Sequence, residues 1–423
     1  MNLRRAIAGT GFEVFRYREY RYFWLGAAFS NVGMWSLIYG RLWLMHNLTD
    51  STLMVGLVTT ATLGPVLLFS MWGGVIADRV NRLRLLRATR AMFAALALLT
   101  GVLIAADVVE PWHLIAISVA TGILLSFDIP SRSAMLPALV PREHLAGAIA
   151  LYSIVFGGAA IIGPAILEPM VDLWGLEGLF FLITIAYVAT VGALAFMSPH
   201  GHKPQSRPTT LIQGLVEGIT YLRRQQVIAG IIGLGMVVGL FGASLNTLLP
   251  ELADNVITGG IDTYSRLLLA AGVGGLSVIA AIAVLSARIR PARYFAIAGM
   301  GHGLGLVLLS QVTWFPGSLL IMGAIGGFHV MFATMSTTLI QTMVADEYRG
   351  RVMSLQQFTW GATALGGLMM GALGQSLGVF VALRLSGIAI AAATGAVALL
   401  SLRRFYQRTL DAAPEAVTSQ GPV

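Results

Sequence analysis

The sequence predicts an all-α membrane protein, in which twelve transmembrane helices form two pseudo-symmetric six-helix bundles. Hydrophobic residues make up 57% of the 423-residue chain and charged residues only 11%, whereas soluble domains carry about 25% charged residues. Apolar runs of about 20 residues, the length that crosses a bilayer as an α-helix, recur along the chain. Nearly all basic residues lie at the ends of these runs, which is where they fix the orientation of a membrane protein.

The apolar runs give the predicted helices in order. They lie at residues 22–45, 53–77, 85–107, 112–130, 146–170, 174–197, 226–250, 264–287, 293–312, 316–342, 353–375 and 378–402. Short connections separate them, except that residues 198–225 form a longer polar segment with Pro199 and Pro204. This segment divides the chain into six helices followed by six.

The placement of the charges predicts the topology. The N-terminal segment, the even-numbered connections and the C-terminal tail hold all 27 Lys and Arg residues except Arg41, Arg266 and Arg384. Short arginine-rich loops stay in the cytoplasm, and an even number of helices places both termini on one side. We therefore expect a multi-pass protein of the bacterial cytoplasmic (inner) membrane with both termini in the cytoplasm. We expect a cytoplasmic N-terminal segment at residues 1–21 and a first six-helix bundle at 22–197. A cytoplasmic linker at 198–225 would lead to the second bundle at 226–402, and residues 403–423 would form a cytoplasmic tail.

The two halves are also related in sequence. Val140 and Val344 lie before the fifth and eleventh predicted helices, and the same offset relates Gly157 to Gly361 within these helices. A parallel repeat of six helices is typical of secondary transporters with two pseudo-symmetric halves.

Several other classes of protein are excluded by missing motifs. The chain has no cysteine, which excludes disulfides and thiolate metal sites. The string of glycines at residues 301–305 lies inside a predicted membrane helix and follows no strand, so it does not indicate a nucleotide loop. No Walker motif, catalytic triad or metal-ligand spacing is present. We expect no enzyme activity, no cofactor, no metal and, because the basic residues mark topology, no nucleic-acid partner.

Several segments carry a resemblance to a known family. Residues 74–82 read Gly-Val-Ile-Ala-Asp-Arg-Val-Asn-Arg, which resembles the loop signature of the major facilitator superfamily. Residues 127–137, Phe-Asp-Ile-Pro-Ser-Arg-Ser-Ala-Met-Leu-Pro, and residues 349–355, Arg-Gly-Arg-Val-Met-Ser-Leu, are similar to signatures of its enterobactin-exporter-like and macrolide-efflux-like branch.

The resemblance implies the major facilitator fold and a monomeric secondary transporter that works by alternating access in the lipid bilayer. The expected substrate is an amphipathic small molecule (a siderophore, drug or metabolite), and the expected process is export coupled to protons. Two alternatives stay open. The same fold could import a metabolite or move a lipid or lysolipid, or it could serve as a transport-inactive sensor or assembly partner.

The same resemblance implies a conformational gate at the arginine-rich loop. Asp78, at the end of the second predicted helix, would accept hydrogen bonds from the N-terminus of the eleventh, whose dipole favours a negative charge. Gly74 would allow close helix approach, and Arg79 and Arg82 would hold charged partners. The alternative is a loop that only sets topology. Asp128 and Arg132 are four residues apart and can pair on one helical face as a partner of this gate.

Ionisable residues inside the predicted spans are candidates for substrate binding or coupling, because they are expensive in a membrane. We expect Arg41 and Glu168 to interact with each other, with substrate or with both; the alternative for each is snorkelling to the interface. His329, in the middle of the tenth span, could bind substrate or carry a proton, or be a neutral structural histidine. His302 in the ninth span is a weaker candidate.

Polar and aromatic residues of the spans could line an amphipathic cavity, since small-molecule sites combine apolar walls with a few polar groups. The alternative is simple helix packing. The candidates are Asn31, Trp35, Asn246, Gln356 and Trp360.

Overall fold

The computed structural model describes residues 11–198, 217, 219–223, 225–285, 289–356 and 358–411. Within these ranges the chain is helical, contains no strand, and crosses the molecule twelve times. Ten of these crossings are long and apolar enough to span a membrane by length and composition. The all-α membrane fold that the sequence predicts is confirmed.

The first half of the described chain follows the predicted helices closely. Its helices are α2 (Arg18–Thr49), α3 (Thr52–Arg79), α4 (Arg82–Ala105), α5 (Pro111–Met135), α6 (Leu145–Ala165) and α7 (Leu167–Ala195). Short turns precede or join them at η1 (Gly11–Arg16), η2 (Leu136–Ala138) and η3 (Arg142–His144). The chain reverses inside α7 at Gly175, whose φ of 70° is a conformation that glycine adopts without steric cost.

The second half departs from the predicted boundaries at three crossings, one of which is the twelfth, whose helix runs on to Asp411 past the predicted end at residue 402. It contains α9 (Gln226–Val237), η4 (Val238–Ala243), α10 (Leu245–Glu251), η5 (Leu252–Val256), α11 (Gly260–Leu285), α12 (Pro291–Leu309), α13 (Phe315–Met343), α14 (Asp346–Gln356), α15 (Phe358–Leu377) and α16 (Val379–Asp411). The seventh crossing runs on to Val256 because the π-helical turns η4 and η5 continue it. The eleventh begins at Asp346, since α14 precedes α15.

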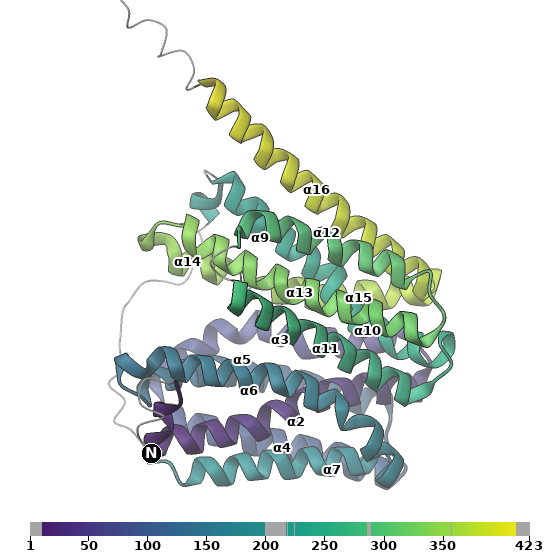
Figure 1. Cartoon of the computed structure of the whole chain (residues 1–423). Helices are drawn as coiled ribbons and strands as arrows, with labels where there is room; N and C mark the ends of the chain where they lie inside the picture. The colour runs from purple at the N-terminus through teal and green to yellow at the C-terminus, as the bar shows by residue number, and fades with distance from the viewer. Residues whose placement is uncertain are drawn as a thin grey trace, which may run out of the picture.

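The helices place unlike charges at the two ends of the molecule. One end, where α3 meets α4 at Asn81 and where η3 carries Arg142, is called the basic end. The opposite end, where α2 ends at Asp50 and α5 begins after Glu110, is called the acidic end. In Figure 1 the basic end lies at the left, beside the label N.

The two halves contact each other through α3 with α15 and through α11 with α6 (Figure 1). Polar contacts between the halves are found toward the acidic end. Ser51 Oγ donates to Gln375 Oε1 at 2.8 Å, and the Tyr264 hydroxyl donates to the Tyr39 carbonyl at 3.2 Å. The acidic end is therefore closed by direct contact between the halves.

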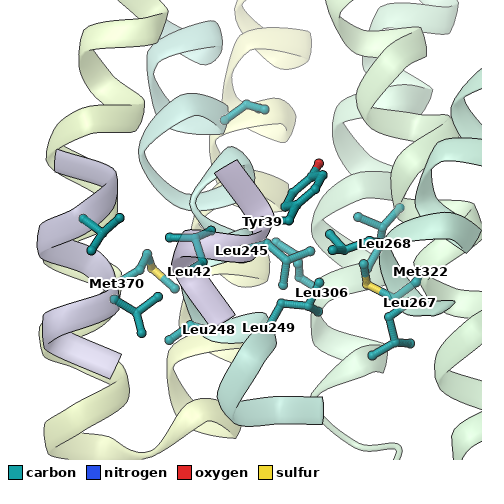
Figure 2. Packing of buried hydrophobic residues seen from close by; sticks show 14 of the residues in the cluster. Tyr39, Leu42, Leu245, Leu248, Leu249, Leu267, Leu268, Leu306, Met322 and Met370 are labelled. Atoms are coloured by element: carbon teal, nitrogen blue, oxygen red, sulfur yellow. The ribbon is translucent and has the colours of Figure 1, made fainter. Parts of the chain in front are cut away.

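The apolar core continues across this contact. Figure 2 shows Leu42 of α2 close to Leu245 and Leu248 of α10, with Met370 of α15 beside them. By contrast, many large apolar side chains on the outside of the bundle are exposed, among them Leu68 and Val284. Such a surface suits the hydrocarbon of a bilayer.

Close packing of α3 on α15 depends on glycine. A Cβ atom on Gly371 would lie 2.5 Å from the Thr52 carbonyl oxygen, and one on Gly56 would lie 2.3 Å from the Gly367 carbonyl oxygen. These distances are too short for any side chain, so Gly367 and Gly371, four residues apart, form a small-residue contact of the kind that brings membrane helices together.

We expect Gly371→Leu to hold the acidic end open. The added side chain would overpack the contact at a cost of about 1–3 kcal/mol, which disfavours the closed contact by roughly 5- to 150-fold. Spin labels across the acidic end would report longer distances. The control is Gly395→Leu, because no atom lies within 4 Å of a Cβ at that position. Unchanged distances in Gly371→Leu would show that the contact does not control closure.

Candidate functional site

A salt bridge lies buried inside the first half. Arg90 on α4 donates to Asp128 on α5, with Nη2 and Oδ2 2.9 Å apart, and the two side chains are only 3% and 1% exposed. The Thr89 hydroxyl donates to the other carboxylate oxygen at 3.1 Å. Both carboxylate oxygens of Asp128 thus accept hydrogen bonds from side chains of α4. The pairing of Asp128 with Arg132 that we expected from their spacing is not the one that the structure forms.

Arg132 contacts different elements. Its Nη1 donates to Asn31 Oδ1 on α2 at 3.3 Å, and its guanidinium lies over the ring of Tyr152 on α6, 5.9 Å from the centroid. Asn31 is itself buried and donates to the Ala27 carbonyl. Arg132 therefore connects three helices of the first half.

Arg41 is fully enclosed and has hydroxyl partners. It is 1% exposed, and its Nη1 donates to Ser118 Oγ at 3.3 Å and Thr121 Oγ1 at 3.0 Å on α5. The contact with Glu168 that we expected is not made. Glu168 instead accepts two hydrogen bonds from Arg266 on α11, at 3.1 and 2.5 Å. That ion pair joins α7 to α11 and so contributes to closing the acidic end.

The interior of the first half holds more positive than negative charge. Tyr187 lies within electrostatic reach of Arg41, Arg90, Asp128 and Arg132. Among these groups three are cations and one is an anion. In a medium of low dielectric constant an uncompensated cation attracts anions strongly. This surplus of positive charge favours an anionic group in the interior of the first half.

Aromatic residues accompany these cations. Trp35 stacks on Tyr39 with ring centroids 5.6 Å apart and meets Phe156 edge-on at 5.9 Å. The buried Nε1 of Trp35 and the hydroxyl of Tyr152 have no hydrogen-bond partner among the described residues. Buried polar groups normally have partners, so these two are available to a ligand.

The second half contributes a pair of histidines. The rings of His302 on α12 and His329 on α13 are 5.4 Å apart. His302 is 1% exposed, and neither of its ring nitrogens has a hydrogen-bond partner among the described residues. The ring lies against Gly242 of the π-helical turn η4, where a Cβ would approach Nε2 to 2.6 Å. π-Helical turns are frequent at functional sites.

The other predicted residues fall into two groups. Gln356 donates to Thr337 Oγ1 at 3.1 Å and keeps a buried Oε1 without a partner in the described chain, and Asn246 is half-buried on α10. The surroundings of Gly74 and the side chains of Asp78 and Trp360 lie outside what the structure describes.

The arginines of the predicted gate hold the ends of neighbouring helices. Arg82 donates from Nη1 to the Ala134 carbonyl at 3.2 Å, whereas Arg79 is exposed. Arg87, which was not among the predicted gate residues, donates to the carbonyls of Leu194 and Met197 at 2.6 and 2.7 Å. Positive charge near the last turn of a helix is favourable, so the arginines also stabilise the basic end.

A separate cavity of about 300 Å³ lies between α2 and α7, lined mainly by apolar residues such as Phe29, Val32 and Leu182. Its polar lining residue, Ser36, donates to the Gly163 carbonyl. None of the predicted site residues lines this cavity. It lacks the charges that an amphipathic ligand would need.

Twelve helices in two halves, with buried charges in their interior, define a membrane transporter of the major facilitator type and not an enzyme. The profile of the transmembrane secretion effector family matches residues 9–420, and the chain belongs to this family.

Two relatives are named for siderophores. The chain is 24% identical over 373 residues to the staphyloferrin A transporter of Staphylococcus aureus, covering 87% of this chain and 92% of the relative. It is 27% identical over 391 residues to an enterobactin exporter of Escherichia coli, covering 88% and 89%.

Solved structures share the fold. One is a bacterial homologue of the human lysosomal transporter Spinster in an inward-facing, unoccupied conformation, with a TM-score of 0.72 at 12% identity, covering 92% of this chain and 98% of that one. Another is a nucleoside transporter, with a TM-score of 0.71 at 12% identity, covering 90% and 99%.

Proposed function

We propose that this transporter exports an amphipathic small molecule with anionic groups, such as a siderophore or a related metabolite or drug, across the bacterial cytoplasmic membrane. The observation that carries the proposal is the surplus of arginine inside the first half, with Arg41 buried and Arg132 half-buried, beside the unpartnered polar groups of Trp35 and Tyr152. Cations attract the anionic part of the substrate, and aromatic rings suit its apolar part. The siderophore names of two relatives support this substrate class.

The mechanism in this proposal is alternating access. Contacts between the halves hold the acidic end closed, and the positive-inside rule places the basic end in the cytoplasm. The structure would then represent the state that receives substrate from the cytoplasm. Rocking of the two halves, residues 22–197 and 226–402, about the site would open the acidic end. The termini, the linker at 198–225 and the tail at 403–423 would be cytoplasmic, and the transporter a monomer.

The proton gradient is the energy source in this proposal, and His302 and His329 are the residues that we expect to carry the proton. Imidazole titrates near physiological pH, and the two rings are close enough for one protonation to affect the other. Both histidines belong to the second half, whereas the arginines expected to attract the substrate belong to the first.

We expect His302→Gln and His329→Gln each to lower gradient-driven transport by roughly a hundredfold or more, the low end of the contribution of a proton-transfer group. Exchange of substrate without a gradient would continue, because it needs no net proton movement. Equal loss of both activities would indicate a structural role. His113, a half-buried histidine at the start of α5 whose Nδ1 accepts a hydrogen bond from the Glu110 N–H, provides the control variant His113→Gln.

The direct test is accumulation of substrate in inverted membrane vesicles under an imposed proton gradient, with a panel of siderophores and lipophilic drugs. Accumulation that an uncoupler abolishes is the predicted result. Uptake in the opposite direction, or movement of lipids between leaflets, would replace export with one of the alternative transport functions. If no compound or lipid moves and none alters the protein's thermal stability, a sensor or assembly partner becomes the better account.

A further inference from the structure

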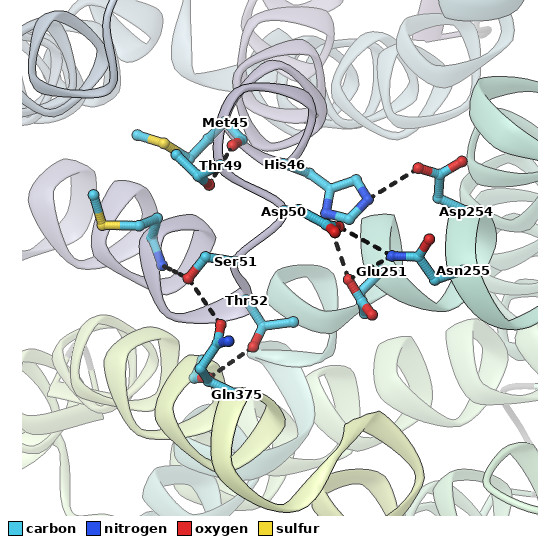
Figure 3. Close-up of polar contacts among 12 residues, drawn as sticks. Met45, His46, Thr49, Asp50, Ser51, Thr52, Glu251, Asp254, Asn255 and Gln375 are labelled. Carbon is cyan, nitrogen blue, oxygen red and sulfur yellow. Dashed lines mark hydrogen bonds and ion pairs between the residues drawn. The ribbon is translucent and has the colours of Figure 1, made fainter.

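A cluster of polar side chains joins the two halves at the acidic end. His46 lies in the last turn of α2, and Asp50 follows it as the C-terminal cap, with a φ of 47°. Glu251 ends α10, and Asp254 lies in η5. Figure 3 shows the imidazole of His46 between these carboxylates. The cluster therefore draws on α2 from one half and on the seventh crossing from the other.

The imidazole is oriented by Asp254. His46 Nε2 lies 3.2 Å from Asp254 Oδ2, and since a carboxylate accepts hydrogen bonds, the proton is on Nε2. In the neutral imidazole the lone pair of Nδ1 then faces the cluster, 3.7 Å from Glu251 Oε2. The side chain of His46 is 1% exposed, and Nδ1 has no hydrogen-bond partner among the described residues.

Potential ligand atoms of the imidazole and the carboxylates thus converge on one place. Ligand atoms of His46, Asp50 and Glu251 all lie within 4.8 Å of one another. Asn255 donates its amide to both Asp50 and Glu251, at 3.1 Å each, which holds the two carboxylates together. A buried acceptor aimed at two carboxylates is unfavourable without a positive charge between them.

We propose that His46, Asp50 and Glu251 bind a divalent transition-metal ion of the zinc class. One imidazole and two carboxylates suit zinc, which takes three protein ligands and water in an open site. Calcium and magnesium prefer oxygen ligands throughout. Asp254 supplies the outer hydrogen bond that metal-bound histidines normally make. Zinc bonds of about 2.0–2.2 Å require the three side chains to move closer together, and the exposed Asp50 gives the ion access from outside.

The ion would act on the conformational cycle. His46 and Asp50 belong to the first half and Glu251 to the second, so the three ligands meet only when the acidic end is closed. A bound ion would hold the halves together there and inhibit transport. This consequence rests on the proposed function, whereas binding of the ion does not.

The binding test is titration of zinc into full-length protein in detergent after removal of metals with a chelator. We expect saturable binding of one ion per chain and a higher melting temperature, with no such effect of magnesium at the same concentration. Loss of an outer hydrogen bond weakens metal binding by a factor of about 10–100. Asp50→Asn and Glu251→Gln each remove a direct ligand and should weaken zinc binding by at least as much. Asp107→Asn, which removes an exposed carboxylate elsewhere at the acidic end, should bind as the wild type does.

Two results would overturn the site: zinc that does not bind saturably, or binding that Asp50→Asn and Glu251→Gln leave unchanged. Asp50 is exposed and its replacement is isosteric, so this variant is expected to fold even where a His46 variant does not. Transport assayed with and without zinc separates the two proposals. Binding without any transport under any condition contradicts the function and not the site, whereas transport without binding contradicts the site alone. Binding that leaves transport unaffected contradicts the inhibition.

Discussion

Replacing Arg41 with methionine is expected to reduce transport strongly while leaving the protein at least as thermally stable as the wild type. Arg41 is 1% exposed, and its side-chain partners are the neutral hydroxyls of Ser118 and Thr121. Burying a charge in a membrane protein is costly, and replacing a buried charge by an apolar residue of similar size is often neutral or stabilising. A charge retained at such a cost is expected to serve the substrate.

The size of the loss follows from the interaction removed. A hydrogen bond to a charged group contributes about 1.5–3 kcal/mol, so transport at low substrate concentration should fall by roughly 10- to 150-fold. Thermal melting and vesicle transport, measured on the same preparation, give the two quantities. The control is Arg384→Met, which removes an exposed arginine of α16. Normal transport by Arg41→Met would remove Arg41 from the site.

Asp128→Asn is expected to destabilise the protein strongly. The substitution leaves Arg90, only 3% exposed, without its carboxylate. Breaking a buried salt bridge from one side costs about 3–5 kcal/mol, because the remaining charge is uncompensated. The double variant Arg90→Met/Asp128→Leu should recover most of this loss. The measurement is the free energy of unfolding in a mixed detergent titration, with the exposed Glu143→Gln as control.

A different outcome would change the role of Asp128. If Asp128→Asn keeps its stability and loses only the dependence of transport on the proton gradient, then Asp128 carries the proton and the histidine pair does not. The close contact with Arg90 and Thr89 makes the structural role the expected one.

The fold could be predicted from the sequence because each membrane helix is identified by the length and hydropathy of its own segment. Length and hydropathy predict the crossings but not all of their ends. The seventh crossing continues as the π-helical turn η5 after Pro250, which lacks the N–H of a regular helical turn.

The partners of the charged residues could not be predicted in the same way. Helical spacing suggested that Asp128 pairs with Arg132 within α5, but the rotation of α4 against α5 brings Arg90 to Asp128 instead. Likewise, the sequence suggests that Glu168 interacts with Arg41, but in the structure it accepts a hydrogen bond from Arg266 of the other half. Such choices depend on how helices pack, which no local pattern specifies.

The polar cluster at the acidic end had no sequence signal for a similar reason. His46 and Glu251 are far apart in the chain and come together only when the two halves close on each other. The missing metal-ligand spacing therefore says nothing about sites built between the halves. The sequence likewise does not show the role of His302, because its contact with His329 depends on the packing of α12 against α13.

Alternating access requires that the acidic end open during transport, and the absence of cysteine from the chain allows this to be measured directly. Ser51 of the first half donates to Gln375 of the second at 2.8 Å, so the double variant Ser51→Cys/Gln375→Cys places two thiols across the closed end. Cross-linking these thiols with a short bifunctional reagent that reduction can cleave should stop transport, and reduction should restore it. The two single-cysteine variants should transport normally before and after treatment. Transport by the cross-linked protein at the rate of the reduced protein would contradict the mechanism.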